Sequence, residues 1–313
     1  MPGTKELKGT LSAALREGIL SHAVLIEGEK GTGRRELALW LAKAILCREE
    51  NRPCGNCSVC RKIENGNHPD VEIFGGNGGA RSFHIESIRE IKNSLWLAPN
   101  ESEQKVYILL DIENMTQEAQ NALLKSLEEP PAHARFILTC DNRKSLLDTI
   151  ISRSTVYTLE PPTREECAFA LREKFPELSE SEAELFSIAY GGNFGAASAG
   201  FSEGIGEIVL LASKVPELLK KGDSYRLAAE LSSKCKTRAE LSEFLERLLN
   251  ITGRCGIDRA AGKKAPVRVS PIEAVKTSEI IERGKLSVLQ NCSIELIESW
   301  LCMELSRIFG GNL

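Results

Sequence analysis

Four short segments of continuous apolar character recur through the first half of the chain, and helical patterns separate them. They are residues 23–26, 106–110, 135–139 and 155–159. A strand that is apolar on both faces must be covered on both faces, as in a parallel sheet between two helix layers. Helical patterns at 36–46 and 117–127 would supply such layers. The first half is therefore predicted to be an α/β domain built on a parallel sheet.

The composition is that of an ordinary soluble globular protein, with 313 residues, 42% hydrophobic and 27% charged. This length allows two or three domains. The net charge of -4 argues against broad coating of nucleic acid, although it allows a local contact to DNA. No signal-like segment begins the chain and no apolar run could cross a bilayer, so a cytoplasmic protein without membrane contact is expected.

The chain changes character at Glu160-Pro161-Pro162, which is predicted to be a domain boundary. Residues 163–201 have the pattern of short helices, and 206–308 that of longer amphipathic helices without a strand signal. A break at 253–270, rich in glycine and basic residues, is predicted to be a mobile loop between helices. The predicted domains are 1–160, 161–204 and 205–313.

The run Gly28-Glu29-Lys30-Gly31-Thr32-Gly33-Arg34-Arg35 lies between the first strand and a helix, as a phosphate-binding loop would. Such a loop continues with a lysine for the β- and γ-phosphates and a hydroxyl for magnesium. Here Arg34 and Arg35 take those two places, and a guanidinium has no lone pair for a cation. Two interpretations remain open: a strand–turn–helix unit kept for its fold, and weak residual nucleotide binding.

Four cysteines follow the spacing C-x6-C-x2-C-x2-C, namely Cys47, Cys54, Cys57 and Cys60. Four thiolates suit a closed, tetrahedral structural zinc site without an open position for catalysis. The alternatives are a chance cluster and an independent nucleic-acid zinc finger, but only Arg52, Arg61 and Lys62 lie close by and no aromatic residue could stack on bases. The six other cysteines are predicted to be small buried hydrophobic residues: Cys140, Cys167, Cys235, Cys255, Cys292 and Cys302.

Three motifs resemble one family, the bacterial clamp-loader AAA+ subunits. Residues 121–131 (NALLKSLEEPP) are similar to the helix after the magnesium-binding strand of that family. Ser152-Arg153-Ser154 resembles its Ser-Arg-Cys motif, with Ser154 in place of the cysteine. The cysteine cluster followed by His68-Pro69-Asp70 resembles its zinc module. By motif the resemblance runs from about residue 21 to 201, and the C-terminal third fits by architecture.

The resemblance implies an AAA+ sheet domain with an inserted zinc module at 47–60, a small helical lid at 161–204, and an all-α collar at 205–313. ATPases of the family end the strand equivalent to 106–110 with Asp-Glu, whereas Asp111 is followed here by Ile112. Glu113 lies one step too far along to be assumed equivalent.

Gly195 stands where motor subunits carry a nucleotide-sensing arginine. The match is to the subunit type that does not hydrolyse ATP. The implied nucleotide site is degenerate and is expected not to bind ATP; it comprises Gly28, Gly33, Arg34, Arg35 and Asp111.

In the family, the arginine of Ser-Arg-Cys reaches across a subunit interface to the γ-phosphate held by a neighbour. Arg153 is accordingly predicted to be an arginine finger that acts in trans and offsets charge in phosphoryl transfer. An ordinary surface salt bridge is the alternative. The apolar stripes at 205–219 and 294–309 would pack into the collar, unless they only bury the domain's own core.

The resemblance implies partners of two kinds: motor subunits of the gamma and tau type with a delta subunit in a hetero-oligomeric ring, and primer-template DNA and the sliding clamp, reached through the complex. The predicted function is to help assemble a clamp loader and to supply Arg153 during DNA replication. An active ATPase with an atypical phosphate-binding loop is the runner-up, and a zinc protein that binds DNA alone is the third alternative.

Overall fold

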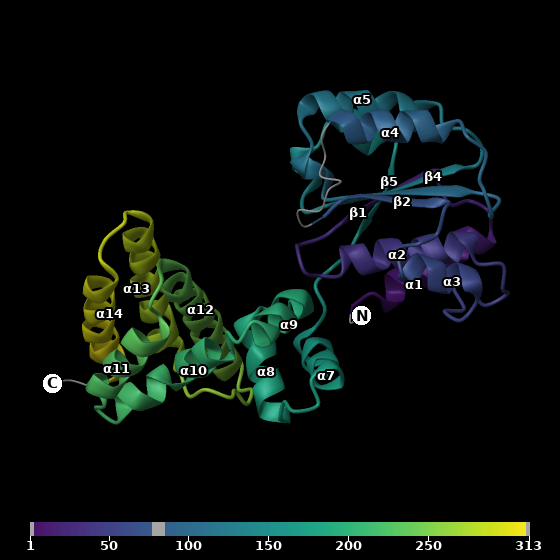
Figure 1. Cartoon of the computed structure of the whole chain (residues 1–313). Helices are drawn as coiled ribbons and strands as arrows, with labels where there is room; N and C mark the ends of the chain where they lie inside the picture. The colour runs from purple at the N-terminus through teal and green to yellow at the C-terminus, as the bar shows by residue number, and fades with distance from the viewer. Residues whose placement is uncertain (1–2, 77–84, 311–313) are drawn as a thin grey trace. The chain divides into compact units, whose positions relative to one another are not determined.

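The computed structural model describes residues 3–76 and 85–310. The chain divides into two compact units, Met1–Pro161 and Pro162–Leu313, and each unit is described by itself. The outermost residues of the predicted domains, 1–2 and 311–313, lie outside the described residues. Figure 1 labels the helices and strands along the chain.

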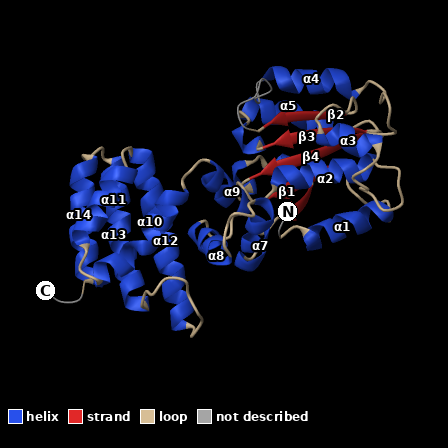
Figure 2. Ribbon diagram, turned by 60° about the horizontal axis from the view of Figure 1, so that its bottom comes forward, coloured by secondary structure: helices blue, strands red, loops and turns tan. Residues whose placement is uncertain are grey.

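The first unit is built on a parallel five-stranded sheet, as the sequence predicted (Figure 2). Its strands are β1 Ala23–Glu27, β2 Val71–Gly75, β3 Lys105–Leu110, β4 Ala134–Cys140 and β5 Thr155–Thr158, in the order β2-β3-β4-β1-β5. The prediction missed β2, because Glu72 interrupts its apolar run. Glu72 forms an ion pair with Lys105 on the neighbouring strand β3, with Lys105 Nζ 3.0 Å from Glu72 Oε1. A polar residue is tolerated there because β2 lies at the edge of the sheet.

Helices cover both faces of the sheet (Figure 1). On one face lie α1 Lys5–Arg16, α2 Arg34–Leu46 and α3 Ser58–Glu64, and on the other lie α4 Ile85–Leu95 and α5 Gln117–Glu128. Short turns complete the unit: η1 Ile112–Asn114, η2 Arg143–Ser145 and α6 Asp148–Ser152. Val24 and Ile26 of β1 pack in the core with α2, whereas Ala23 and Leu25 pack in the core with α5. This alternation follows from the two-residue period of a strand.

The second unit is built from helices joined by short loops, with no strand among its described residues. They are α7 Arg164–Lys174, α8 Glu180–Ala189, α9 Phe194–Ser202, α10 Gly206–Lys220, α11 Ser224–Lys234, α12 Arg238–Ala260, α13 Pro271–Leu289 and α14 Ile294–Phe309. Four of them begin with a capping box, in which a Ser or Thr and the Glu three residues later satisfy free backbone N–H groups. The capping residues are Thr163, Ser179, Thr237 and Ser270.

The predicted loop at 253–270 is wrong over its first half, because α12 continues to Ala260. Two glycines suggested a break, since glycine is a poor helix former. Packing outweighs that preference: Gly256 is buried, and a Cβ at this position would lie 2.5 Å from the Cβ of Ala274 on α13. Only residues 261–270 connect α12 to α13.

The apolar stripes at 205–219 and 294–309 lie largely inside the core of the second unit, where Val209, Val215, Leu301 and other members are fully buried. The large apolar side chains that stay exposed come mainly from α13 and the start of α14. They include Ile272, Val275, Leu286, Leu289 and Leu296. The surface available for a partner therefore differs from the predicted stripes.

Two smaller expectations concern cysteines and membranes. Five of the six scattered cysteines are buried as predicted, and Cys292 is half-buried against the helical core. Within residues 3–76 and 85–310, no helix taken singly has the length and apolar character needed to cross a membrane. The consecutive helices α9 and α10, bent by 106°, meet those criteria only as a pair.

Candidate functional site

The glycine-rich turn between β1 and α2 is folded as the sequence predicted. A side chain at Gly28 would lie 2.7 Å from the carbonyl oxygen of Leu159, so only glycine fits there. Gly31 and Gly33 have φ angles of 90° and 100°, in the left-handed region that favours glycine. The buried Thr32 closes the turn, because its hydroxyl donates to the carbonyl of Glu29 over 2.7 Å.

Arg34 begins α2 and points into a cluster of carboxylates rather than to solvent, with 6% of its side chain exposed. Its Nη2 lies 3.0 Å from Oδ1 of Asp111 and 3.2 Å from Oδ1 of Asp141. Its Nη1 lies 3.7 Å from Oε1 of Glu113. We call these four residues the Arg34 cluster. They bring together the start of α2 and the carboxyl ends of β3 and β4.

In the Arg34 cluster, one guanidinium faces three carboxylates. Burial raises the pKa of the Glu113 carboxyl, and its hydrogen bonds and the charge of Arg34 oppose that effect. The backbone N–H of Asp141 donates to Glu113 Oε1 over 3.1 Å. A magnesium ion at Asp111 would lie beside the buried guanidinium, which already pairs with Oδ1 and would repel the cation.

Arg35, the second arginine of the loop, is exposed and lies away from the carboxylates. A Cβ at Gly76, which follows β2, would lie 3.2 Å from Nη1 of Arg35. The two arginines therefore occupy different surroundings. Neither presents a hydroxyl that could hold a cation beside the loop.

Sequence reasoning missed two members of the Arg34 cluster. Glu113 was set aside as one step too far along, but η1 buries Ile112 and returns Glu113 to Arg34. Asp141 carried a readable signal, because it directly follows a strand just as Asp111 does. The carboxyl ends of parallel strands share one edge of a sheet, where ligand sites gather.

Replacing Arg34 with alanine should destabilise the first unit by about 1.5–3 kcal/mol at neutral pH, because three partly exposed carboxylates lose their buried partner. Folding raises the pKa of the Glu113 carboxyl, and loss of the opposing Arg34 charge should raise it further. A protonated Glu113 then stabilises the folded state at low pH. This contribution is lost as the pH rises above the ordinary glutamate pKa of about 4.3. The deficit of the variant should therefore shrink toward pH 4. Urea unfolding at several pH values measures this. Arg35→Ala is the matched control and should stay within about 0.5 kcal/mol; equal losses in both variants would contradict the expectation.

Arg153 caps the C-terminal end of α6 and is 36% exposed. Its Nη2 lies 2.7 Å from Oε1 of Glu128, at the end of α5. Its Nη1 donates to the carbonyl of Thr149 over 3.3 Å and to the hydroxyl of Ser152 over 3.2 Å. The side chain is thus partly exposed at the surface, and it makes the salt bridge of the alternative interpretation.

The four cysteines of the predicted zinc module come together, with all Sγ atoms within 4.8 Å of one another. Ligand sulfurs around a tetrahedral zinc ion lie about 3.8 Å apart when the Zn–S distance is about 2.3 Å. Cys47 Sγ and Cys57 Sγ are 3.9 Å apart. The cluster therefore has the donor set and the spacing to hold a single metal ion such as zinc.

Local backbone geometry supports the same cluster. Cys47 ends α2, Cys57 caps α3, and Cys60 lies in the first turn of α3. The N–H of Cys57 donates to Cys54 Sγ over 3.3 Å, and that of Cys60 donates to Cys57 Sγ over 3.4 Å. Backbone hydrogen bonds from Asn56 and Cys57 lower the pKa of the Cys54 thiol to about 7. Burial raises the pKa of the Cys60 thiol to about 12.

Two basic residues beside the zinc module bond to groups of the protein itself, which leaves less positive charge for nucleic acid and does not favour an independent zinc finger. Lys62 pairs with Glu101, with Nζ 2.8 Å from Oε1. Arg61 donates to the carbonyl of Asn56 over 2.8 Å.

His68-Pro69-Asp70 has a structural role. Asp70 is fully buried and accepts from the N–H groups of Asn100, Glu101 and Ser102 over 2.5, 2.8 and 2.8 Å. Burial raises the pKa of Asp70, but these donors outweigh it and hold the pKa below its usual value. The carboxylate thus anchors the loop that precedes β3.

In the second unit, Gly195 lies in the first turn of α9, where the side chain of Asn193 caps the helix by accepting from the N–H of Ala196 over 3.0 Å. Gly195 offers no side chain that could reach a nucleotide.

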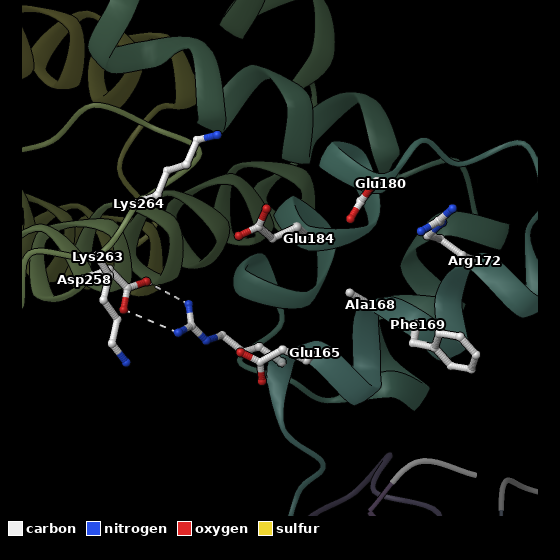
Figure 3. A pocket seen from close by; sticks show the side chains of 10 residues that line it. Glu165, Ala168, Phe169, Arg172, Glu180, Glu184, Asp258, Lys263 and Lys264 are labelled. Carbon is white, nitrogen blue, oxygen red and sulfur yellow. Dashed lines mark hydrogen bonds and ion pairs between the residues drawn. The ribbon is translucent and has the colours of Figure 1, made fainter.

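A hollow of about 370 Å³ in the second unit holds none of the predicted site residues (Figure 3). Charged residues of both signs line it, among them Glu184, Lys263 and Lys264. At one side Arg164 Nη1 lies 2.8 Å from Oδ2 of the buried Asp258, which holds α7 to α12. Its charges are mixed and partly paired, so we assign it no chemistry.

Residues 3–163 match the family described as DNA polymerase III, delta subunit. A DNA polymerase III subunit delta' of Bacillus subtilis is 41% identical over 144 residues, 45% of this chain and 43% of that protein. A delta' subunit of Haemophilus influenzae is 36% identical over 154 residues, 49% of this chain and 46% of that protein. The chain thus spans less than half the length of both relatives.

Among solved structures, a DNA polymerase III gamma-subunit-related protein of Thermotoga maritima is similar with a TM-score of 0.54 and 21% identity. The match covers 96% of this chain and 99% of that one. At this identity the likeness concerns the fold alone.

Proposed function

Because the chain belongs to the family described as DNA polymerase III, delta subunit, we propose that it is a delta-prime-type clamp-loader subunit that does not hydrolyse ATP. The observation that carries the proposal is the Arg34 cluster. Arg34 neutralises Asp111, the residue from which a magnesium ion would be held, and its fixed positive charge disfavours a cation beside that carboxylate. The loop keeps its glycine geometry but has lost the lysine and the hydroxyl that make it a nucleotide site.

Arg153 supplies the catalytic part of this function in trans. It lies partly exposed at the end of α6, and its planar guanidinium suits a phosphate oxygen better than a lysine would. In the assembled loader, Arg153 reaches the γ-phosphate held by a neighbouring gamma- or tau-type subunit and stabilises charge during transfer. The chain thereby controls hydrolysis that it cannot perform.

The remaining parts of the chain serve assembly. Residues 161–204 form a lid domain and 205–313 a collar domain that joins the other subunits, including a delta subunit, in a ring. The exposed Leu289 and Leu296, at 77% and 65%, support this role, because a subunit interface that covered them would bury their apolar surface. Primer-template DNA and the sliding clamp are engaged through the complex.

Zinc, held by Cys47, Cys54, Cys57 and Cys60, is structural in this proposal. When bound, the ion ties the end of α2 to the turn before α3. Four thiolates leave it no open coordination position, so the reaction does not pass through it.

Nucleotide binding to the isolated chain tests the proposal. Titration with a fluorescent ATP analogue and magnesium should give no saturable binding up to the millimolar range, because the cation has no place beside Arg34. A gamma- or tau-type subunit of the same bacterium is the positive control. Micromolar, magnesium-dependent binding with turnover would instead establish an active ATPase with an atypical loop.

A further inference from the structure

Two of the three guanidinium nitrogens of Arg153, Nη1 and Nη2, are engaged by its own chain. Nη2 faces Glu128 Oε1 at 2.7 Å, and Nη1 donates to the carbonyl of Thr149 and the hydroxyl of Ser152. All of these acceptors lie on α5 or α6. The Arg153 side chain therefore lies against α5 and α6 of its own subunit, and it would have to leave these contacts to reach a neighbouring subunit.

Of two neighbouring glutamates at the end of α5, only one pairs with Arg153 in the described part of the chain. Glu128 ends α5 and pairs with Arg153, whereas Glu129, the next residue, makes no ion pair within the described part of the chain. Both side chains are exposed, so they differ in their contact to Arg153 rather than in burial. The pair offers a matched comparison of the same chemical change.

We propose that Glu128 is a positioning residue that competes with the neighbour's phosphate for Arg153. The inference rests on the proposed function and adds a control to it. A carboxylate and a phosphate oxygen bind the same N–H groups of a guanidinium, so Arg153 must leave Glu128 before it can engage a γ-phosphate in full. The ion pair is 36% and 43% exposed, and a pair of this kind shifts an equilibrium by only about 1.5- to 5-fold. Glu128 thus retracts the finger in the absence of a correctly seated neighbour and yields when one is present.

The test compares Glu128→Gln with Glu129→Gln in the complex assembled with gamma- or tau-type and delta subunits. Both changes remove a charge and keep the size and one acceptor oxygen. The measured quantity is the part of ATP turnover that depends on Arg153, which is the difference between each complex and its Arg153→Ala counterpart. Glu128→Gln should raise this part about 1.5- to 5-fold with an unchanged KM for ATP. Glu129→Gln should leave it as in the wild type.

The double variant Glu128→Gln, Arg153→Ala should turn over as Arg153→Ala alone does, because the effect of Glu128 passes through the arginine. A change caused by Glu128→Gln in the Arg153→Ala background would overturn the inference, as would a fall in turnover. If Arg153→Ala lowers turnover and Glu128→Gln does nothing, the competition is absent and the proposed function stands. If Arg153→Ala has no effect, the proposed function itself fails. Equal unfolding midpoints for all variants establish that the fold is intact.

Discussion

Replacing Arg153 with alanine in the assembled complex is expected to slow ATP hydrolysis at the site it serves by about 10³-fold or more. Total turnover should fall by the share which that site contributes. In the proposed role the guanidinium acts on charge that develops during transfer, so the loss should appear in kcat rather than in the KM for ATP. Steady-state ATPase assays on complexes purified by size exclusion measure both, and the elution volume reports whether assembly is intact.

Arg143→Ala is the matched control. Arg143 is also exposed and also ion-paired, with its Nε 3.4 Å from Oε2 of Glu27, but it lies outside the Ser-Arg-Ser segment. It should leave hydrolysis unchanged. Arg153→Lys keeps the positive charge but loses the planar guanidinium with its paired N–H donors, so it should recover only part of the rate of ATP hydrolysis. If the Arg153→Ala complex assembles and turns over normally, Arg153 is a surface arginine in a salt bridge.

Loss of the metal from the cysteine cluster should have the largest effect on stability. Structural zinc sites contribute roughly 10–16 kcal/mol of apparent binding free energy at neutral pH. Cys57→Ser removes one ligand and the sulfur that accepts from the N–H of Cys60. The variant is expected to purify without stoichiometric zinc and to melt roughly 10 °C or more below the wild type. Metal content by mass spectrometry and thermal unfolding measure the two effects.

Limited trypsin digestion locates that loss, because Arg52, Arg61 and Lys62 lie within or beside the module. Cleavage there should accelerate in Cys57→Ser and in wild-type protein treated with a chelator. Cys292→Ser is the control, since this half-buried cysteine lies outside the cluster. Zinc-free wild-type protein that keeps its melting temperature and resists trypsin would show that the module needs no metal.

Much of the fold and part of the candidate site could be predicted from the amino-acid sequence. The parallel sheet followed from four apolar segments, because strands that are apolar on both faces demand two helix layers. The cysteine cluster followed from spacing alone, since three ligands within seven residues of chain can hardly lie far apart. The glycine-rich turn followed from the local run at 28–35 between a strand and a helix, and Gly31 and Gly33 adopt the left-handed φ angles that favour glycine. In each case the cause is local in the sequence.

The errors of prediction, and one alternative that was left open, arose where distant residues meet. Residues 253–260 carry two glycines and read as a break, yet packing on α13 keeps them helical. The stripes at 205–219 and 294–309 are apolar whether they face a partner or their own domain, and only the packed helices assign them to the core. Glu72 concealed β2, which pairing with β3 makes a strand.

The amino-acid sequence by itself determined that the phosphate-binding loop lacks its lysine and hydroxyl, because these are identities at fixed positions in a local motif. Only the tertiary structure decided where the substituted arginine goes. Arg34 meets Asp111, Glu113 and Asp141, which lie 77, 79 and 107 positions further along the chain, because parallel strands end at one edge of the sheet. Likewise, Arg153 is evident as a motif, but its contact with Glu128 depends on how α5 and α6 pack. Charge pairing across such separations has no periodicity in sequence, and the fold alone creates it.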